Sequence, residues 1–131
     1  MEEMNINLKF AFLISKHAIP LMVSAKNGKI VLVSSRTGLK SDGYDSAYSA
    51  SKSGLIWLVE SISEEVKEHC CININCILPS IIDTETNRKA MPNSDFSKWV
   101  KPLLTKMRAQ RVPREKHSKD RLNNQWHRMK K

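Results

Sequence analysis

The feature that most constrains the fold is an apolar pattern running from residue 29 to residue 78. Residues 29–35 (KIVLVSS) form a short β-branched run closed by small polar residues, which predicts a strand buried on both faces. From Asp45 or Ser46, apolar residues recur every three or four positions as far as Val66, which predicts an amphipathic helix of about six turns. Residues 71–78 (CININCIL) then predict a second strand, ended by Pro79. This order predicts a strand–helix–strand unit with parallel strands, and so an α/β fold.

The segments around this unit are less regular. Residues 3–23 carry apolar side chains at helical spacing and predict a preceding helix with a broad apolar face. Residues 36–45 are polar, contain two glycines and predict a loop. After Trp99 we find neither a helical nor a strand period.

Charge divides the chain at the same point. The formal net charge is +9, and residues 100–131 hold half of the 22 basic residues but only Glu115 and Asp120 of the 13 acidic ones. Residues 1–99 are therefore neutral overall, which excludes a uniformly basic nucleic-acid-binding domain. The basic tail is either a solvated extension or an arm that binds nucleic acid or another acidic partner.

Several absences narrow the class of protein. No run of about 18 apolar residues is present, and the acidic start lacks the basic region of a secretory signal. We therefore expect a cytoplasmic protein that does not span a membrane. The three cysteines lie within seven positions, which predicts reduced, buried thiols, and no Cys/His spacing indicates a metal site. None of the four glycines forms a phosphate-binding turn.

The candidate chemistry lies where the first strand meets the long helix. Tyr48 and Lys52 are four residues apart, so both side chains point the same way from the helix. This spacing is common by chance, but Ser35 ends the preceding strand, and the carboxyl ends of parallel strands border the ligand crevice of such folds. A hydroxyl, a phenol and an ammonium at one edge suit the polarisation of a carbonyl and the transfer of a proton.

With these residues in place, the sequence resembles the second half of a short-chain dehydrogenase/reductase over about residues 3–99. The resemblance rests on the run from Gly28 to Ser35, on the spacing of Ser35, Tyr48 and Lys52, on Asn7 in the preceding helix, and on residues 75–84 (NCILPSIIDT). It implies a partial Rossmann-like, doubly wound fragment with parallel strands and two long helices. Residues 83–99 are similar to the branch that includes quinoid dihydropteridine reductase.

The resemblance also implies a role for each candidate residue. Tyr48 would be the general acid in reduction and the base in oxidation, while Lys52 would stabilise the phenolate and hold the nicotinamide ribose. Ser35 would bind the substrate oxygen and Asn7 a water of the proton relay. The cofactor, NAD or NADP, would also meet a further set of residues: Pro79, Ile82 and Thr84. The substrate would be a small carbonyl or alcohol, and the two long helices would form the interface of a homo-oligomer.

The sequence departs from that family at three places. The family's Gly-rich turn, its first four strands and the residue that selects NAD or NADP have no counterpart here. Ser80 replaces a usual glycine, and a basic tail follows Pro102 in place of an acidic helix and a last strand. We therefore expect residues 1–99 to be the C-terminal half of the domain and 100–131 a disordered or out-of-frame tail. Such a truncated chain would be marginally stable and weakly active or inactive. The alternative is a non-enzymatic interaction protein that binds through its tail.

Overall fold

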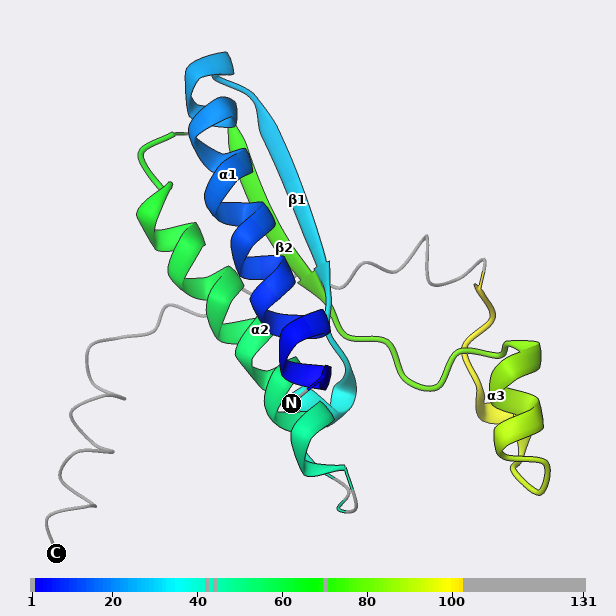
Figure 1. Cartoon of the computed structure of the whole chain (residues 1–131). Helices are drawn as coiled ribbons and strands as arrows, with labels where there is room; N and C mark the ends of the chain where they lie inside the picture. The colour runs from blue at the N-terminus through cyan, green and yellow to red at the C-terminus, as the bar shows by residue number, and fades with distance from the viewer. Residues whose placement is uncertain (1, 42, 44, 70, 103–131) are drawn as a thin grey trace, which may run out of the picture.

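The computed structural model describes residues 2–41, 43, 45–69 and 71–102 (Figure 1). Its elements in chain order are the π-helical η1 (Met4–Lys9), α1 (Phe10–Ala25), β1 (Gly28–Val33), the 3-10 helix η2 (Arg36–Gly38), α2 (Ser46–Glu65), β2 (Ile72–Ile77), α3 (Glu85–Ala90) and the 3-10 helix η3 (Phe96–Lys98).

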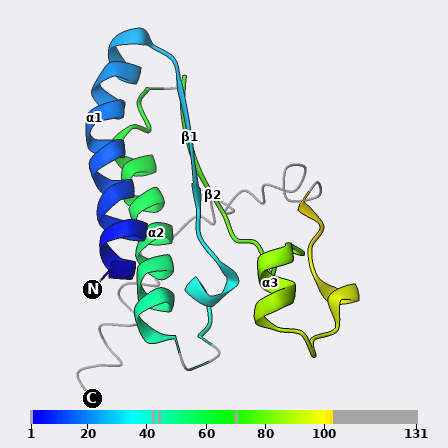
Figure 2. The same ribbon diagram turned by 45° about the vertical axis from the view of Figure 1, so that its right-hand side comes forward.

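The two strands form a parallel sheet, with Gly28 opposite Ile72 at one end and Val33 opposite Ile77 at the other. Helices α1 and α2 lie side by side on the same face of this sheet (Figures 1 and 2). The parallel strands joined by a long helix confirm the predicted strand–helix–strand unit and the α/β class.

The apolar core lies between the second helix and the sheet. Two α2 positions, the C-cap residue of α2 and three β2 positions are buried together: Val59, Ile62, Val66, Ile72, Ile74 and Cys76. Side chains of α1 and β1 pack around them, which fixes α1 beside α2: Ile19, Met22, Val23, Ile30 and Leu32. The spacing that predicted the long helix is therefore the spacing of its core-facing stripe.

The prediction that the first strand is buried on both faces was wrong. Val31 and Val33 are 52% and 50% exposed, while Ile30 and Leu32, which alternate with them, pack against the core. The alternation arises because successive strand side chains point to opposite faces, and within the described residues helices cover only one of them.

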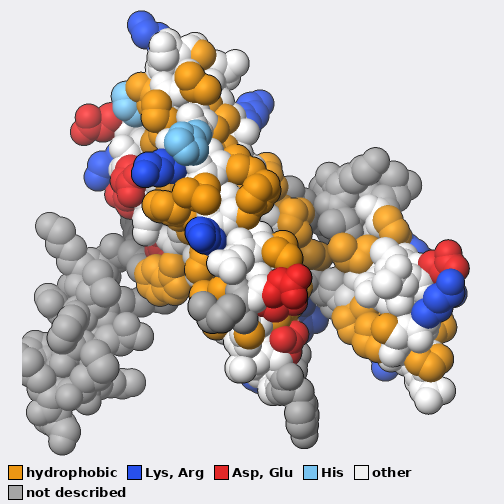
Figure 3. Space-filling view, viewed as in Figure 1, with side chains coloured by type: hydrophobic (Ala, Val, Ile, Leu, Met, Phe, Trp, Pro, Cys, Tyr) orange, Lys and Arg blue, Asp and Glu red, His pale blue; other side chains and the backbone are white. Residues whose placement is uncertain are grey.

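The first helix differs from its prediction in geometry and in exposure. It begins with the π-helical η1, continues through Pro20 to Ala25, and has Ser15 as the only buried residue of α1. Its apolar side chains lie mostly on the surface: Ile6, Phe10, Phe12, Leu13, Ile14 and Leu21. Figure 3, viewed as in Figure 1, shows hydrophobic side chains on the surface over the two long helices.

By length and composition, the helix from Met4 to Ala25 could cross a membrane. The sequence predicted no membrane-spanning segment, because it contains no uninterrupted apolar run of that length. Polar residues such as Asn7 and Lys16 interrupt the apolar run within this helix, but its mean hydropathy remains high enough for a membrane-spanning segment.

A smaller unit follows the sheet and was not predicted. Residues 81–101 contain α3 and η3, and they lie beyond the carboxyl end of β2 in both ribbon views (Figures 1 and 2). Among the cysteines, Cys76 is buried as expected but Cys71 is exposed, and Cys70 lies outside the described residues. The basic tail expected over 100–131 also lies outside them from residue 103 onward.

Candidate active site

The start of α2 is held against the carboxyl end of β1. The Ser34 hydroxyl donates a hydrogen bond to the Lys52 carbonyl at 2.7 Å. A Cβ atom on Gly38 would lie 2.9 Å from the same carbonyl group, so the loop after β1 can approach the helix only because position 38 has no side chain. The first turns of α2 are thereby fixed at the sheet edge where ligands bind in folds of this type.

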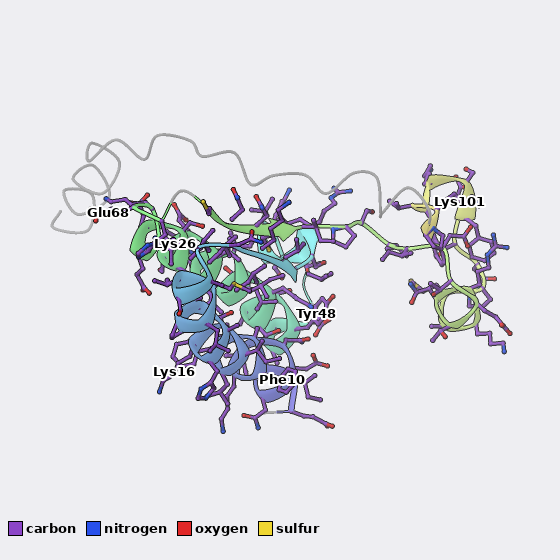
Figure 4. All side chains as sticks on the ribbon, turned by 90° about the horizontal axis from the view of Figure 1, so that it is seen from above. Phe10, Lys16, Lys26, Tyr48, Glu68 and Lys101 are labelled. Carbon is purple, nitrogen blue, oxygen red and sulfur yellow. The ribbon has the colours of Figure 1, made fainter. Side chains whose placement is uncertain are left out.

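Tyr48 and Lys52 are neighbours at this edge. The Lys52 ammonium lies 5.4 Å from the centroid of the Tyr48 ring and donates a hydrogen bond to the Val33 carbonyl at 3.0 Å. Burial lowers the pKa of Lys52, an effect that nearby Cys76 and Glu3 partly oppose. Figure 4 shows Tyr48 at the end of α2 that carries this pair. Within the described residues the phenol makes no hydrogen bond.

Ser35 follows β1 at the same edge but contacts a different partner. Its hydroxyl oxygen accepts hydrogen bonds from the Thr37 amide at 3.3 Å and from the Thr37 hydroxyl at 3.0 Å, and so caps η2. In the described part of the chain no hydrogen bond joins Ser35 to Tyr48 or Lys52. The Ser35 hydroxyl keeps its own proton, which it can donate to a third group.

Asn7 reaches the site through a buried serine. The Asn7 side-chain amide donates to the Ser51 hydroxyl at 3.1 Å and to a Glu3 carboxylate oxygen at 2.7 Å. Ser51 is fully buried and donates to the Tyr48 carbonyl at 2.8 Å. Asn7 is therefore linked to the backbone turn that carries Tyr48, and not to the phenol itself.

Three residues that position the candidate residues were not predicted from the sequence: Ser34, Gly38 and Ser51. Only Ser34 had a readable signal, because two adjacent serines end the first predicted strand. Ser51 pairs with a residue 44 positions away, and Gly38 is required by an approach of backbone to backbone. Neither relation leaves a local pattern.

The three residues expected to meet the cofactor follow β2. The Pro79 carbonyl accepts from the Arg36 amide at 3.3 Å, which joins this stretch to the loop after Ser35. The Ile82 carbonyl accepts from the Asn87 side chain at 2.8 Å. The Thr84 hydroxyl accepts from the Asn87 amide at 3.2 Å and so caps α3. Its proton remains available as a donor.

A family model described as short chain dehydrogenase matches residues 1–95. The match covers well over half of the chain, and the parallel α/β layer agrees with it. The chain therefore belongs to the short-chain dehydrogenase family, a family of oxidoreductases.

Individual relatives support the assignment. The chain is 32% identical over 97 residues to the 3-oxoacyl-(acyl-carrier-protein) reductase FabG of Chlamydia trachomatis, covering 74% of this chain and 38% of that protein. Among solved structures, a short chain dehydrogenase from Escherichia coli CFT073 complexed with NADPH superposes with a TM-score of 0.65 at 26% identity, covering 76% of this chain and 41% of that one. A 4-hydroxyisoleucine dehydrogenase complexed with NADH and succinate superposes with a TM-score of 0.65 at 27% identity, covering 79% and 46%.

The comparisons with these relatives extend over only part of each relative. The chain spans less than half the length of the relatives that it matches. The family and the Rossmann-like fold expected from the sequence are confirmed. The roles of the individual site residues stay predictions.

Proposed function

We propose that this chain supplies the catalytic half of an NAD(P)-dependent oxidoreductase that interconverts a small carbonyl compound and its alcohol. The observation that carries the proposal is the Tyr48–Lys52 pair at the carboxyl end of β1, where the phenol has no hydrogen-bonding partner among the described residues. An unengaged phenol beside an ammonium can donate a proton to a carbonyl oxygen and take it back from an alcohol.

The donors at this edge fit the nicotinamide end of the cofactor. The Lys52 ammonium uses one of its three N–H donors on Val33, which leaves two for ribose hydroxyls. The Thr84 hydroxyl can donate to the carboxamide, beside the backbone of Ile82 and Pro79. NADPH and NADH are each bound by a structural relative, so either form is open to this chain. When bound, the nicotinamide supplies or accepts the hydride.

The protein residues then handle the proton and the substrate oxygen. Ser35 donates its free hydroxyl proton to the substrate oxygen and orients it toward Tyr48. Tyr48 transfers a proton to that oxygen during reduction, and the Lys52 charge stabilises the phenolate that remains. Asn7, held through Ser51, anchors a water that returns the proton.

These residues do not provide a binding site for the pyrophosphate end of the cofactor. With four glycines and no Gly-rich turn, the sequence lacks the backbone amides that cradle phosphates in such folds. We propose that a phosphate site belongs to the portion of the relatives that this chain does not cover, and that this chain alone turns over weakly or not at all. Among the described residues β1 pairs only with β2, and its other margin is open, which fits that assignment. We also propose a cytoplasmic location and self-association through α1 and α2.

A chain that holds only the nicotinamide end of the cofactor should distinguish between two fragments of that cofactor. Reduced nicotinamide mononucleotide carries the nicotinamide end alone, and AMP carries the adenosine end alone. We expect the mononucleotide at millimolar concentration to shift the NMR amide signals of residues 34–36, 48–52 and 82–84 of the full chain, and AMP to leave them unchanged.

A pair of lysine substitutions, one at the candidate site and one outside it, separates loss of a specific contact from loss of charge. Lys52→Met should weaken mononucleotide binding by about tenfold, because a charge-assisted hydrogen bond is lost. Lys67→Met removes an exposed ammonium just beyond α2 and should have no effect. Equal shifts with AMP, or binding that Lys52→Met leaves intact, would contradict the proposal.

The second candidate function is binding of nucleic acid or another acidic partner by the tail. It rests on the concentration of the whole +9 charge in residues 100–131. Such binding would weaken steeply with salt through counterion release. A gel shift that persists after deletion of residues 100–131 would contradict it.

A further inference from the structure

The segment from Ile81 to Lys101, called here the α3 segment, is closed at its base. The Asp83 amide donates to the Val100 carbonyl at 2.8 Å, and the Val100 amide donates to the Ile81 carbonyl at 2.8 Å. Ile82 and Val100 thus form an isolated parallel bridge. The chain leaves the sheet, forms α3 and η3, and returns to its starting point.

One carboxylate joins three parts of this segment. Asp83 accepts two hydrogen bonds from the Arg88 guanidinium of α3, at 2.6 Å and 3.0 Å. It also accepts one from the Lys101 ammonium at 2.5 Å. The Asp83 side chain is only 5% exposed, whereas the two cations remain about half exposed. A two-point Arg–carboxylate pair fixes orientation as well as distance.

Aromatic packing continues from the same guanidinium. Arg88 lies 4.7 Å over the Phe96 ring, and Phe96 meets Trp99 edge to face at 4.8 Å. Trp99 is buried at 7% exposure. The carboxylate therefore fixes Arg88, and Arg88 covers the small aromatic cluster of the segment.

Asp83 places this arrangement next to the residues proposed to meet the cofactor. It stands between Ile82 and Thr84, the two residues proposed to meet the cofactor carboxamide. Thr84 caps α3, and its carbonyl accepts from the Arg88 amide at 2.9 Å. Rotation of α3 would therefore move the Thr84 hydroxyl.

We propose that Asp83 is a positioning residue that locks α3 and the end of the segment together, and so holds Ile82 and Thr84 in place for the nicotinamide carboxamide. This inference rests on the proposed function, because it needs a nicotinamide end bound at this edge. Arg88 and Lys101 hold the pKa of Asp83 well below its ordinary value, so the locking charge is present at neutral pH.

The test compares Asp83→Asn with Glu85→Gln in the full chain. Both changes remove one negative charge from the same segment, but among the described residues Glu85 forms only an exposed pair with Lys89. With Trp57→Phe and Trp126→Phe as background, Trp99 is the sole tryptophan. Asp83→Asn should raise acrylamide quenching of Trp99 at least twofold, and Glu85→Gln should leave it unchanged.

The second measurement follows reduced nicotinamide mononucleotide by NMR. In Asp83→Asn the shift of the Thr84 amide should be lost while that of the Lys52 amide persists. Shifts at both amides that match those of the unsubstituted chain overturn the inference and leave the proposed function standing. A parent chain that shows no shift at either amide overturns the proposed function and the positioning role together. Equal loss at both amides in the variant assigns Asp83 a general structural role and also overturns the inference.

Discussion

The strand–helix layer and the α3 segment hold their residues by opposite means. The layer, from Met4 to Ile77, buries aliphatic side chains of α2 and β2 against each other, and its register follows from that packing. The α3 segment buries one tryptophan and depends on a carboxylate that binds two cations. The residues proposed for proton transfer are therefore held in place by apolar packing, whereas those proposed to meet the carboxamide are held by ion pairs.

This difference matters because the two kinds of contact respond to different changes. Apolar burial depends on volume, and an isolated cavity costs free energy wherever it forms. A charge network depends on protonation and geometry. Perturbing each region through the kind of contact on which it depends, while the other region is monitored, is therefore a direct way to test the comparison.

The largest effect is expected from a cavity in the layer. Ile62→Ala should lower the free energy of unfolding by about 2–5 kcal/mol, because Ile62 is buried between α2 and β2. Urea unfolding followed by far-UV circular dichroism measures it. Leu21→Ala is the control, since Leu21 is largely exposed and its loss should change little. A midpoint that Ile62→Ala does not move would break the comparison at once.

A smaller effect is expected where the loop meets α2. Gly38→Ala would place a methyl group 2.9 Å from the Lys52 carbonyl and force the helix start to shift, at a cost of about 1–3 kcal/mol. Binding of reduced nicotinamide mononucleotide should fall in parallel. Leu39→Ala, at an exposed neighbouring position, serves as the matched control. Unchanged binding in Gly38→Ala would show that this approach does not position Lys52.

The pH dependence of the α3 segment should separate it from the layer. Since Asp83 has its pKa depressed on folding, its stabilising contribution is complete above the ordinary carboxyl value of 3.8 and is lost only as pH falls through the lower folded value. Trp99 fluorescence in the single-tryptophan background should therefore stay constant from neutral pH to about 4 and change below it. A transition near pH 6 would contradict the ionic account.

The smallest effect is expected at the cap of α3. Thr84→Ala removes the acceptor of the Asn87 amide and should cost the segment about 1 kcal/mol. Hydrogen exchange at residues 85–90 measures the change, and it should leave α2 unaffected. Thr84→Ser keeps the cap and should restore protection. Loss of protection in α2 as well would mean that the two regions are not independent.

The strand–helix–strand order was predictable because its signals are local. Apolar spacing marked α2 to within a residue of its start at Ser46, and the four-residue interval placed Lys52 beside Tyr48. The family could be inferred from residue types at those positions. The helix and the Tyr48–Lys52 pair needed information from only a few neighbouring turns, whereas the family needed several short motifs in their order along the chain.

The missing parts depend on contacts between distant positions. Asp83 and Lys101 are 18 residues apart, and nothing in either neighbourhood indicates that they meet. Asn7 reaches the Tyr48 turn only through Ser51. The exposure of Val31 depends on what else covers the sheet, which the composition of a strand cannot reveal.

The bond from Lys52 to Val33 also bears on how the sheet can grow. The Ser34 amide donates to Ile77 of β2. The Val33 carbonyl belongs to the same trans peptide and so faces the opposite, unpaired margin. The ammonium donates to that carbonyl from the same margin along which a further strand would pair with β1. A strand paired along this margin would therefore meet the lysine side chain beside residue 33.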